Sequence, residues 1–280
     1  TVGKIECINV VMIESYNSYL DLDSAKALRY ECDNILTHDP LEQKTWWYGF
    51  DRPPQNILEN FIFQSARQHN VFHSYIGAEW WIRSHDSLDS SWIFHVDGDL
   101  GQSRRGDQYL SAPFCTITYL TDYGQPTVVL DHMHDWNKKG FYIMGDNEWS
   151  FWASPKMGKH INWSLPYFHG VPHNFGYLPE GEKRVTLMFN TWKTRPWEPE
   201  CIEYNLDYKI SGGEVKLIPE KDTTIKWLEP HGFFTTKLED ALDVAIQYHG
   251  YNQRGESWLV SQFAPENTDL TPRFPTQESH

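Results

Sequence analysis

The sequence is poor in cysteine and in long apolar runs. Its four cysteines show no CxxC spacing, which argues against a disulfide framework and a thiolate zinc site and favours a reducing compartment. No apolar run approaches the ~18 residues that a membrane-spanning helix needs. The N-terminal stretch lacks the basic and then apolar pattern of a signal peptide. We therefore expect a cytoplasmic protein with no membrane partner.

Positive charge is also scarce. The chain has 24 Lys and Arg against 38 Asp and Glu, which gives a net charge of −14. Binding to a phosphate-rich surface needs a basic face, so this balance argues against a general nucleic-acid or anionic-membrane binder. We expect no nucleic-acid partner and, instead, a small-molecule substrate.

Aromatic residues, in contrast, are abundant. They make up 15% of the 280 residues and include 13 Trp, in a chain that is 40% hydrophobic and 22% charged. This composition is typical of a soluble globular protein, and the length allows a substantial buried core. So many rings suggest a β-rich core and an aromatic-lined cavity.

The first stretch, 1–70, is expected to form a helical flank with loops. Apolar residues recur there at helical spacing, behind Asp23 or Ser24 as the N-cap. They are Ala25, Leu28, Cys32 and Ile35. A second helix is predicted over 57–69, after a two-proline break.

Residues 71–192 are expected to form a β-rich core. Short runs of β-branched and aromatic residues alternate there with turn residues. The predicted strands cover 74–83, 91–95, 114–120, 127–131, 140–144, 148–152, 159–163, 167–171 and 184–192. Many short strands at this spacing indicate a sandwich or barrel such as a jelly roll. The predicted fold class is therefore β-rich α+β, with a double-stranded β-helix (jelly-roll, cupin-like) core.

Residues 193–280 mix short strands with one predicted helix. Thr236 opens a capping box, and an apolar stripe follows over 238–249. His249, at the end of this stripe, is expected to be structural. No Gly/Ser linker precedes the stretch, so we expect a C-terminal mixed α/β extension packed on the core, within a single catalytic domain over 1–280.

A histidine and an aspartate lie two residues apart where the predicted strand 91–95 ends. Residues i and i+2 of a strand point the same way, so His95 and Asp97 can supply two neighbouring metal ligands. A mononuclear iron that activates O2 needs two neutral imidazoles and one carboxylate on one face of an octahedron. An HxD pair alone is common by chance, so the interpretation depends on a third ligand.

A third ligand is available 72 residues after Asp97. His169 lies in the predicted strand YFHGV, and 15 residues later Arg184 and Thr186 begin another strand. A guanidinium can bind a carboxylate through two hydrogen bonds, and positions 184 and 186 share one face of that strand.

Taken in order, H-x-D, a distant His and R-x-T resemble the Fe(II)- and 2-oxoglutarate-dependent oxygenases, over about residues 91–192. The resemblance implies an iron triad of His95, Asp97 and His169. It also implies that Fe(II), the co-substrate 2-oxoglutarate and O2 take part, with ascorbate as a possible supporting reductant.

The resemblance also assigns a binding site for 2-oxoglutarate. Arg184 would form a salt bridge with the distal carboxylate of the co-substrate, and Thr186 would donate a hydrogen bond to it. Tyr119, in CTITYLTD, matches a tyrosine that reaches the same carboxylate in prolyl-hydroxylase-like members. Aromatic residues on strands are more often core residues, so the alternative is that Tyr119 only packs in the core.

Three other histidines compete for the metal. His173, four residues after His169, also fits the interval to Arg184. We prefer His169 because a predicted strand leads into it and HGV is the common context in the family. His132 and His134 form an HxH motif, but we expect them in a charged loop between strands.

The resemblance implies oxidation of an unactivated C–H bond, most simply hydroxylation, with release of succinate and CO2. The substrate would be a small molecule such as an amino acid or a specialised metabolite. Because halogenating relatives lack the acidic ligand, Asp97 argues against halogenation, while desaturation, cyclisation and epimerisation stay open. Arg104 and Arg105, in the loop after HxD, could clamp an anionic group of the substrate, although a solvated loop is the alternative.

Other functions remain as hypotheses. One is a peptidyl side-chain hydroxylase of the same superfamily. A cupin-type metal enzyme would bind iron without using 2-oxoglutarate, and a non-catalytic β-sandwich would bind no iron at all.

Overall fold

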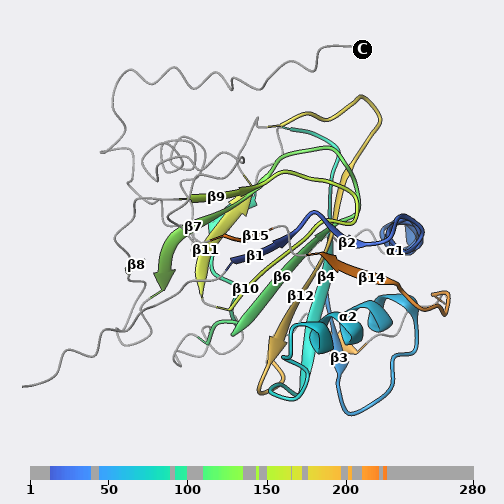
Figure 1. The fold of residues 1–280 in the computed structure, drawn as a ribbon, viewed down its shortest axis with the longest axis vertical. Coiled ribbons are helices and arrows are strands. Elements are labelled where there is room, and N and C mark those ends of the chain that lie inside the picture. Colours follow the sequence, from blue (N-terminus) through green and yellow to red (C-terminus); the bar gives the residue numbers. More distant parts are fainter. Residues whose placement is uncertain are drawn as a thin grey trace, which may run out of the picture.

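The structure is a computed structural model of the chain. It describes 13–38, 44–88, 92–99, 110–134, 143–144, 150–164, 166–171, 176–196, 201–203, 210–220 and 223–225. These residues form two helices and fifteen strands (Figure 1). Apart from the parallel pairing of β13 with β3, the strands pair antiparallel. Neither helix of the described chain combines the length and apolar character that crossing a membrane requires.

The larger sheet has eight strands. In spatial order they are β13 (Cys201–Glu203), β3 (Thr45–Gly49), β4 (Gly77–His85), β12 (Arg184–Trp192), β6 (Phe114–Tyr119), β10 (His160–Trp163), β1 (Ile13–Tyr16) and β15 (Thr223–Ile225). All nine residues of β12 are buried. A strand at the centre of a sheet that is covered on both faces has this pattern.

The smaller sheet lies across from it. Its strands are β5 (Trp92–His95), β11 (Tyr167–Val171), β7 (Thr127–His134) and β8 (Ile143–Met144), and β9 (Ser150–Ala153) also pairs with β7. A third sheet joins β14 (Leu217–Glu220) to β2 (Ser18–Leu20). Between β4 and β12 the chain passes back and forth between the two main sheets.

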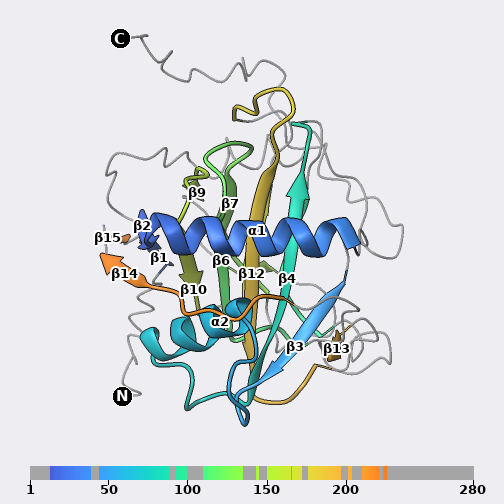
Figure 2. The same cartoon turned by 90° about the vertical axis from the view of Figure 1, so that its right-hand side faces the viewer.

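Both helices cover one face of the larger sheet. α1 (Leu22–His38) runs across its strands, and α2 (Ile57–Gln68) lies beside it (Figure 2). The predicted apolar stripe of α1 is confirmed, because all four of its residues are fully buried. The predicted cap is wrong, because the Ser24 amide donates to Oδ1 of Asp21 at 2.9 Å. Asn56 caps α2 by accepting from the Glu59 amide.

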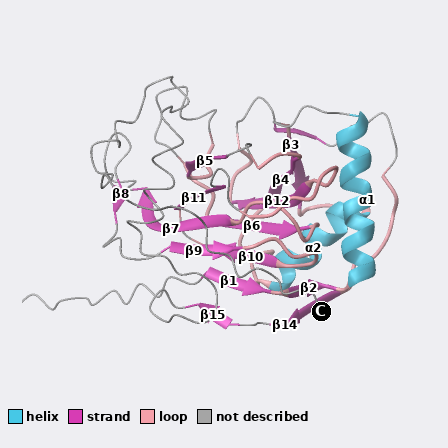
Figure 3. Ribbon diagram, turned by 90° about the horizontal axis from the view of Figure 1, so that it is seen from above, coloured by secondary structure: helices cyan, strands magenta, loops and turns pink. Residues whose placement is uncertain are grey.

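Two apolar layers result from this arrangement. One lies between the helices and the larger sheet and contains Phe61, Trp80 and Phe189. The other contains residues of both main sheets, among them Trp81 and Tyr167. Figure 3 shows both helices on one side of the strands. Because successive strand residues point to opposite faces, Trp80 and Trp81 contribute to different layers.

The main difference from the sequence-based expectation lies in 1–70. This stretch, expected to hold only helices and loops, also contains β1, β2 and β3. These strands are three to five residues long, and β1 pairs only with the distant β10 and β15. A short strand with distant partners leaves no periodic pattern in the local sequence.

The other predictions have mixed outcomes. The bounds of β11 and β12 are as predicted, whereas β4 starts later and ends at His85. His132 and His134 lie in β7 and not in a loop, so that prediction is wrong. β13, β14 and β15 fall within 193–280, where short strands are expected. The helix predicted over 238–249 lies outside the described residues.

Candidate metal centre

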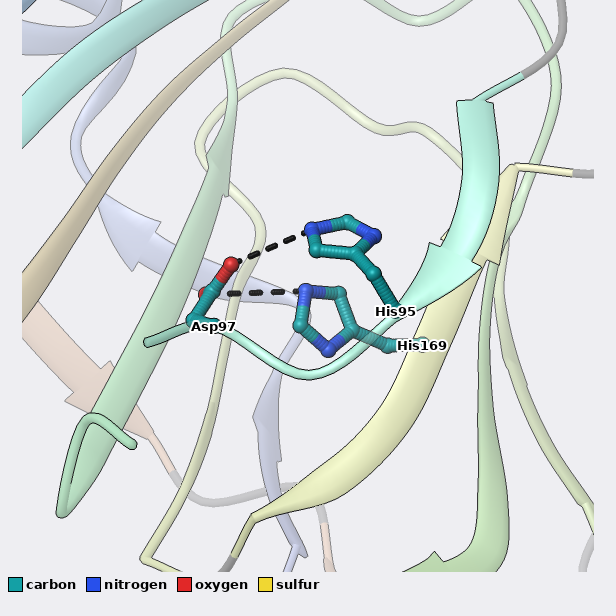
Figure 4. Close-up of side chains that lie close together, drawn as sticks. All are labelled: His95, Asp97 and His169. Atoms are coloured by element: carbon teal, nitrogen blue, oxygen red, sulfur yellow. Dashed lines mark hydrogen bonds and ion pairs between the residues drawn. The ribbon is translucent and has the colours of Figure 1, made fainter. Parts of the chain in front are cut away.

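Three predicted ligands meet in the layer between the two main sheets. His95 is the last residue of β5, Asp97 follows it by two residues, and His169 lies in β11. β5 and β11 are antiparallel neighbours that place His95 directly opposite His169, so both rings lie on the same face. One ligand atom from each of the three residues lies within 4.8 Å of the others (Figure 4). In the described chain this is the one such cluster of His, Cys, Asp or Glu that fits a metal.

The Asp97 carboxylate faces both imidazoles. Its Oδ1 lies 3.1 Å from His95 Nε2, and its Oδ2 lies 3.5 Å from His169 Nε2. The two ring centroids are 4.5 Å apart. The His95 side chain is 33% exposed and that of His169 only 7%. Solvent therefore reaches the cluster mainly from the His95 side.

The tautomer of His169 follows from the contact that its Nδ1 atom makes. Nδ1 lies 3.1 Å from the carbonyl oxygen of Tyr167. A carbonyl can only accept, so Nδ1 carries a proton. Burial lowers the pKa of His169 to about 4, although the Asp97 charge acts in the opposite direction. The ring is therefore neutral at pH 7, and its Nε2 presents a bare lone pair to Asp97.

Asp97 is ionised at this position. Burial disfavours its charge, but the His169 and His95 rings and the side-chain amide of Asn190 outweigh that effect and hold the pKa of Asp97 well below its usual range. The amide Nδ2 of Asn190 donates to Oδ2 at 3.0 Å. Neutral imidazole and ionised carboxylate are the protonation states that a metal ligand requires.

Arg184 lies at the start of β12 and is 2% exposed. Its Nε donates to the backbone oxygen of Gln125 at 2.9 Å, and its Nη2 donates to Thr127 Oγ1 at 3.0 Å. No ion pair joins it to an acid among the described residues. Burial lowers the pKa of Arg184, yet a guanidinium stays protonated in proteins. Among the described residues, the acceptors that hold this buried cation are neutral.

Two further predicted residues, Thr186 and Tyr119, lie directly opposite each other on β12 and β6. Within the described chain the buried Oγ1 of Thr186 has no hydrogen-bond partner. The Tyr119 ring centroid is 5.4 Å from the Arg184 guanidinium carbon. Its hydroxyl donates to the Ala153 carbonyl at 2.8 Å. Burial raises the pKa of Tyr119, so this hydroxyl stays a donor.

Gly124 makes room for the arginine stem. Its φ of +108° lies in the left-handed region. A Cβ on it would lie 2.5 Å from Arg184 Cβ, which is closer than two non-bonded carbons can approach. The backbone amide of Gly124 donates to the Tyr177 carbonyl at 2.7 Å, and this hydrogen bond fixes the turn.

Some predicted site residues lie outside the described chain, and two residues that contact the site were not predicted. Arg104, Arg105 and His173 lie outside the described residues. Sequence reasoning missed Thr127, which contacts Arg184, and Asn190, which contacts Asp97. Asn190 does share a strand face with Arg184 and Thr186, because even intervals separate the three.

No family model matches the chain, and no curated protein sequence matches it. Solved structures do match, 114 chains in all. A prolyl-4-hydroxylase from Pseudomonas putida is 14% identical, with a TM-score of 0.43 over 65% of this chain and 88% of its own.

Two further matches cover 74% of this chain and 94% of their own. The non-heme alpha-ketoglutarate-dependent epimerase SnoN from nogalamycin biosynthesis is 11% identical, with a TM-score of 0.43. HygX from Streptomyces hygroscopicus, with nickel and 2-oxoglutarate bound, is 12% identical, with a TM-score of 0.39. These structural neighbours are 2-oxoglutarate-dependent oxygenases and related enzymes. The TM-scores are below 0.5, so the chemistry of this chain depends on its own side chains.

Proposed function

We propose that this protein is an Fe(II)- and 2-oxoglutarate-dependent oxygenase that hydroxylates an unactivated C–H bond of a small molecule and releases succinate and CO2. The observation that carries the proposal is the contact between His169 and Asp97. A neutral, buried imidazole turns its bare Nε2 toward a carboxylate oxygen 3.5 Å away. Two electron-pair donors are stable at this distance when a cation lies between them.

The donor set favours iron over a hard cation. Ca²⁺ and Mg²⁺ prefer oxygen ligands, whereas two imidazoles and one carboxylate are the ligands of mononuclear non-haem iron. His95, Asp97 and His169 would hold Fe(II) and leave part of its coordination sphere open. Together with 2-oxoglutarate and O2, the iron supplies the oxidation of a C–H bond. The protein orients the ligands and excludes water.

Arg184 has no acidic partner among the described residues, which supports 2-oxoglutarate as the co-substrate. Its guanidinium would bind the carboxylate that is remote from the metal. The hydroxyl of Thr186 would donate to the same carboxylate, which would satisfy an otherwise unpartnered buried oxygen. Tyr119 would line this end of the site. A co-substrate without negative charge would leave this buried cation with no acidic partner in the part of the chain that the structure describes.

The strand order supports the predicted core. β4, β12, β6 and β10 are adjacent in the larger sheet, and β5, β11, β7 and β9 are adjacent in the smaller one. Passage of the chain between two four-stranded sheets in this way is typical of a jelly roll. We infer that these eight strands form a double-stranded β-helix with the triad inside it.

For the substrate we propose a chemical class. A small molecule such as an amino acid or a specialised metabolite fits best, with Arg104 and Arg105 predicted to bind an anionic group of it. We also propose a cytoplasmic location. The buried, free thiols of Cys32 and Cys115 are compatible with its reducing conditions.

The proposal is tested by succinate formation from 2-oxoglutarate, with Fe(II), ascorbate and a panel of amino acids and metabolites. We expect turnover by the wild type and none by His169→Ala, whereas His173→Ala should retain most of it. Metal analysis of each purified variant separates the alternatives. Iron bound without any 2-oxoglutarate turnover would favour a cupin-type enzyme, and no bound iron would favour a binding module.

A further inference from the structure

Asn190 connects the larger sheet to the triad. It lies near the end of β12, opposite Glu79 on β4 and opposite Cys115 on β6. The side chain is almost fully buried, with 2% exposure. Its Nδ2 donates to Asp97 Oδ2 at 3.0 Å, across 93 residues of sequence. β12 thus supplies a direct contact to a ligand that itself lies at the exit of β5.

The two ends of this amide have different environments. The NH2 group faces a carboxylate, which can only accept, so the orientation of the amide is fixed. The other end, Oδ1, is buried and has no hydrogen-bond partner among the described residues. If the amide served only to satisfy the core, both ends would be expected to be bonded. The side chain is therefore placed for Asp97.

The neighbouring residue provides an internal comparison. Thr191 is fully buried, and its Oγ1 also lacks a partner. It points to the opposite face of β12, because successive strand residues alternate. Thr191 thus shares the strand and the burial of Asn190 without the contact to Asp97.

We propose that Asn190 is a positioning residue that holds Asp97 as a one-oxygen metal ligand. Its hydrogen bond occupies one lone pair of Oδ2 and fixes the orientation of the carboxylate, which disfavours ligation through both oxygens. One-oxygen ligation keeps three positions of a six-coordinate metal open, as activation of O2 at the metal requires. The inference rests on the proposed function, because it assumes a metal between the three ligands.

The test uses Co(II) alone as the probe, without co-substrate or O2. Asn190→Leu keeps the branched shape of the side chain, although leucine is larger, and removes the donor. Asn190→Ala is the second variant if the leucine variant does not fold. We expect a Kd for Co(II) raised about 10- to 100-fold, the usual effect of losing a hydrogen-bond partner of a ligand. We also expect a changed visible absorption spectrum of the bound Co(II), because the carboxylate becomes free to bind through both oxygens.

Thr191→Val is the matched control and should keep the wild-type Kd and spectrum. The inference fails if a folded Asn190 variant binds Co(II) with the wild-type Kd and spectrum. It also fails if Thr191→Val shows the same loss, because packing of β12 would then explain both effects. A wild type that binds no Co(II) would overturn the proposed function as well, which distinguishes the two failures.

Discussion

The Nε2 atoms of His69 and His160 lie 3.2 Å apart, in the layer between the helices and the larger sheet. His160 Nδ1 lies 2.8 Å from Thr118 Oγ1, and His69 Nδ1 lies 3.6 Å from Glu14 Oε2. The Tyr19 hydroxyl is 3.2 Å from His69 Nε2. One shared proton between the two rings satisfies this chain, whereas a second proton would make both Nε2 atoms donors.

This pair predicts a loss of stability in acid. Burial lowers the pKa of His160 well below 6.5, and the neighbouring His69 adds to the effect. Below pH ~6.5 the unfolded chain binds a proton at this residue that the folded chain does not, so stability is present above that pH and is lost as pH falls. Between pH 7.5 and 5.5 the free energy of unfolding should fall, and His160→Gln should reduce that fall by about 1 kcal/mol.

Urea unfolding of the wild type and His160→Gln at the two pH values measures the difference. His85 also titrates in the same direction, since burial lowers its pKa to about 4. His85→Gln is therefore a second variant with the same expected sign. An equal pH dependence in the wild type and His160→Gln would contradict the assignment to His160.

Replacement of Arg184 should weaken the binding of 2-oxoglutarate. Arg184→Leu removes the buried positive charge, and loss of a buried ion pair of about 3 kcal/mol corresponds to a KM raised about 100-fold. The kcat at saturating co-substrate should change much less. Steady-state kinetics with varied 2-oxoglutarate measure both constants. Arg67→Leu, at the end of α2, is the charge-matched control and should leave the KM unchanged.

Thr186→Val separates co-substrate binding from stability. The Thr186 hydroxyl is buried without a partner, so its removal should not lower the free energy of unfolding and can raise it slightly. The KM for 2-oxoglutarate should nevertheless rise about 5-fold, as expected for a lost hydrogen bond of ~1 kcal/mol. Thr191→Val on the same strand should show the same stability effect with an unchanged KM. If Thr186→Val and Thr191→Val had the same KM for 2-oxoglutarate, the proposed role of Thr186 would be refuted.

Gly124→Ala should destabilise the protein and weaken 2-oxoglutarate binding together. The new Cβ would lie 2.5 Å from Arg184 Cβ, so the arginine must move. Gly181→Ala is the control, because its φ of +77° imposes a similar backbone cost while no atom lies within 4 Å of the new Cβ. We expect about 1 kcal/mol of destabilisation from the backbone conformation alone in Gly181→Ala, and a larger loss plus a raised KM in Gly124→Ala. Thermal unfolding and kinetics of the two variants measure this.

Much of the core was predictable because its signals are local. β12 is rich in β-branched and large apolar residues and lies between Lys183 and Lys193, and its bounds match those predicted from the sequence. His95 and Asp97 share a strand end, and His169 lies on a recognisable strand, so their meeting depends on a single pairing between β5 and β11. The stripe of α1 is similarly local.

The remaining features depend on contacts between distant segments. β1 exists through its pairing with β10 and β15, and nothing in IESY requires it. The contact of Asn190 with Asp97 spans 93 residues and joins β12 to the segment that follows β5. The sequence shows an asparagine at position 190, but it does not show that this side chain contacts Asp97. The same applies to His69 and His160, which are 91 residues apart.

The central claim is that one site binds both Fe(II) and 2-oxoglutarate. Anaerobic addition of Fe(II) and then 2-oxoglutarate, followed by visible absorption spectroscopy, tests it most directly, because a keto acid chelated to Fe(II) gives a charge-transfer band. We predict a band that needs both additions, is absent in His169→Ala, and in Arg184→Leu requires more 2-oxoglutarate. A wild type that binds Fe(II) but develops no band at any concentration of 2-oxoglutarate would contradict the account.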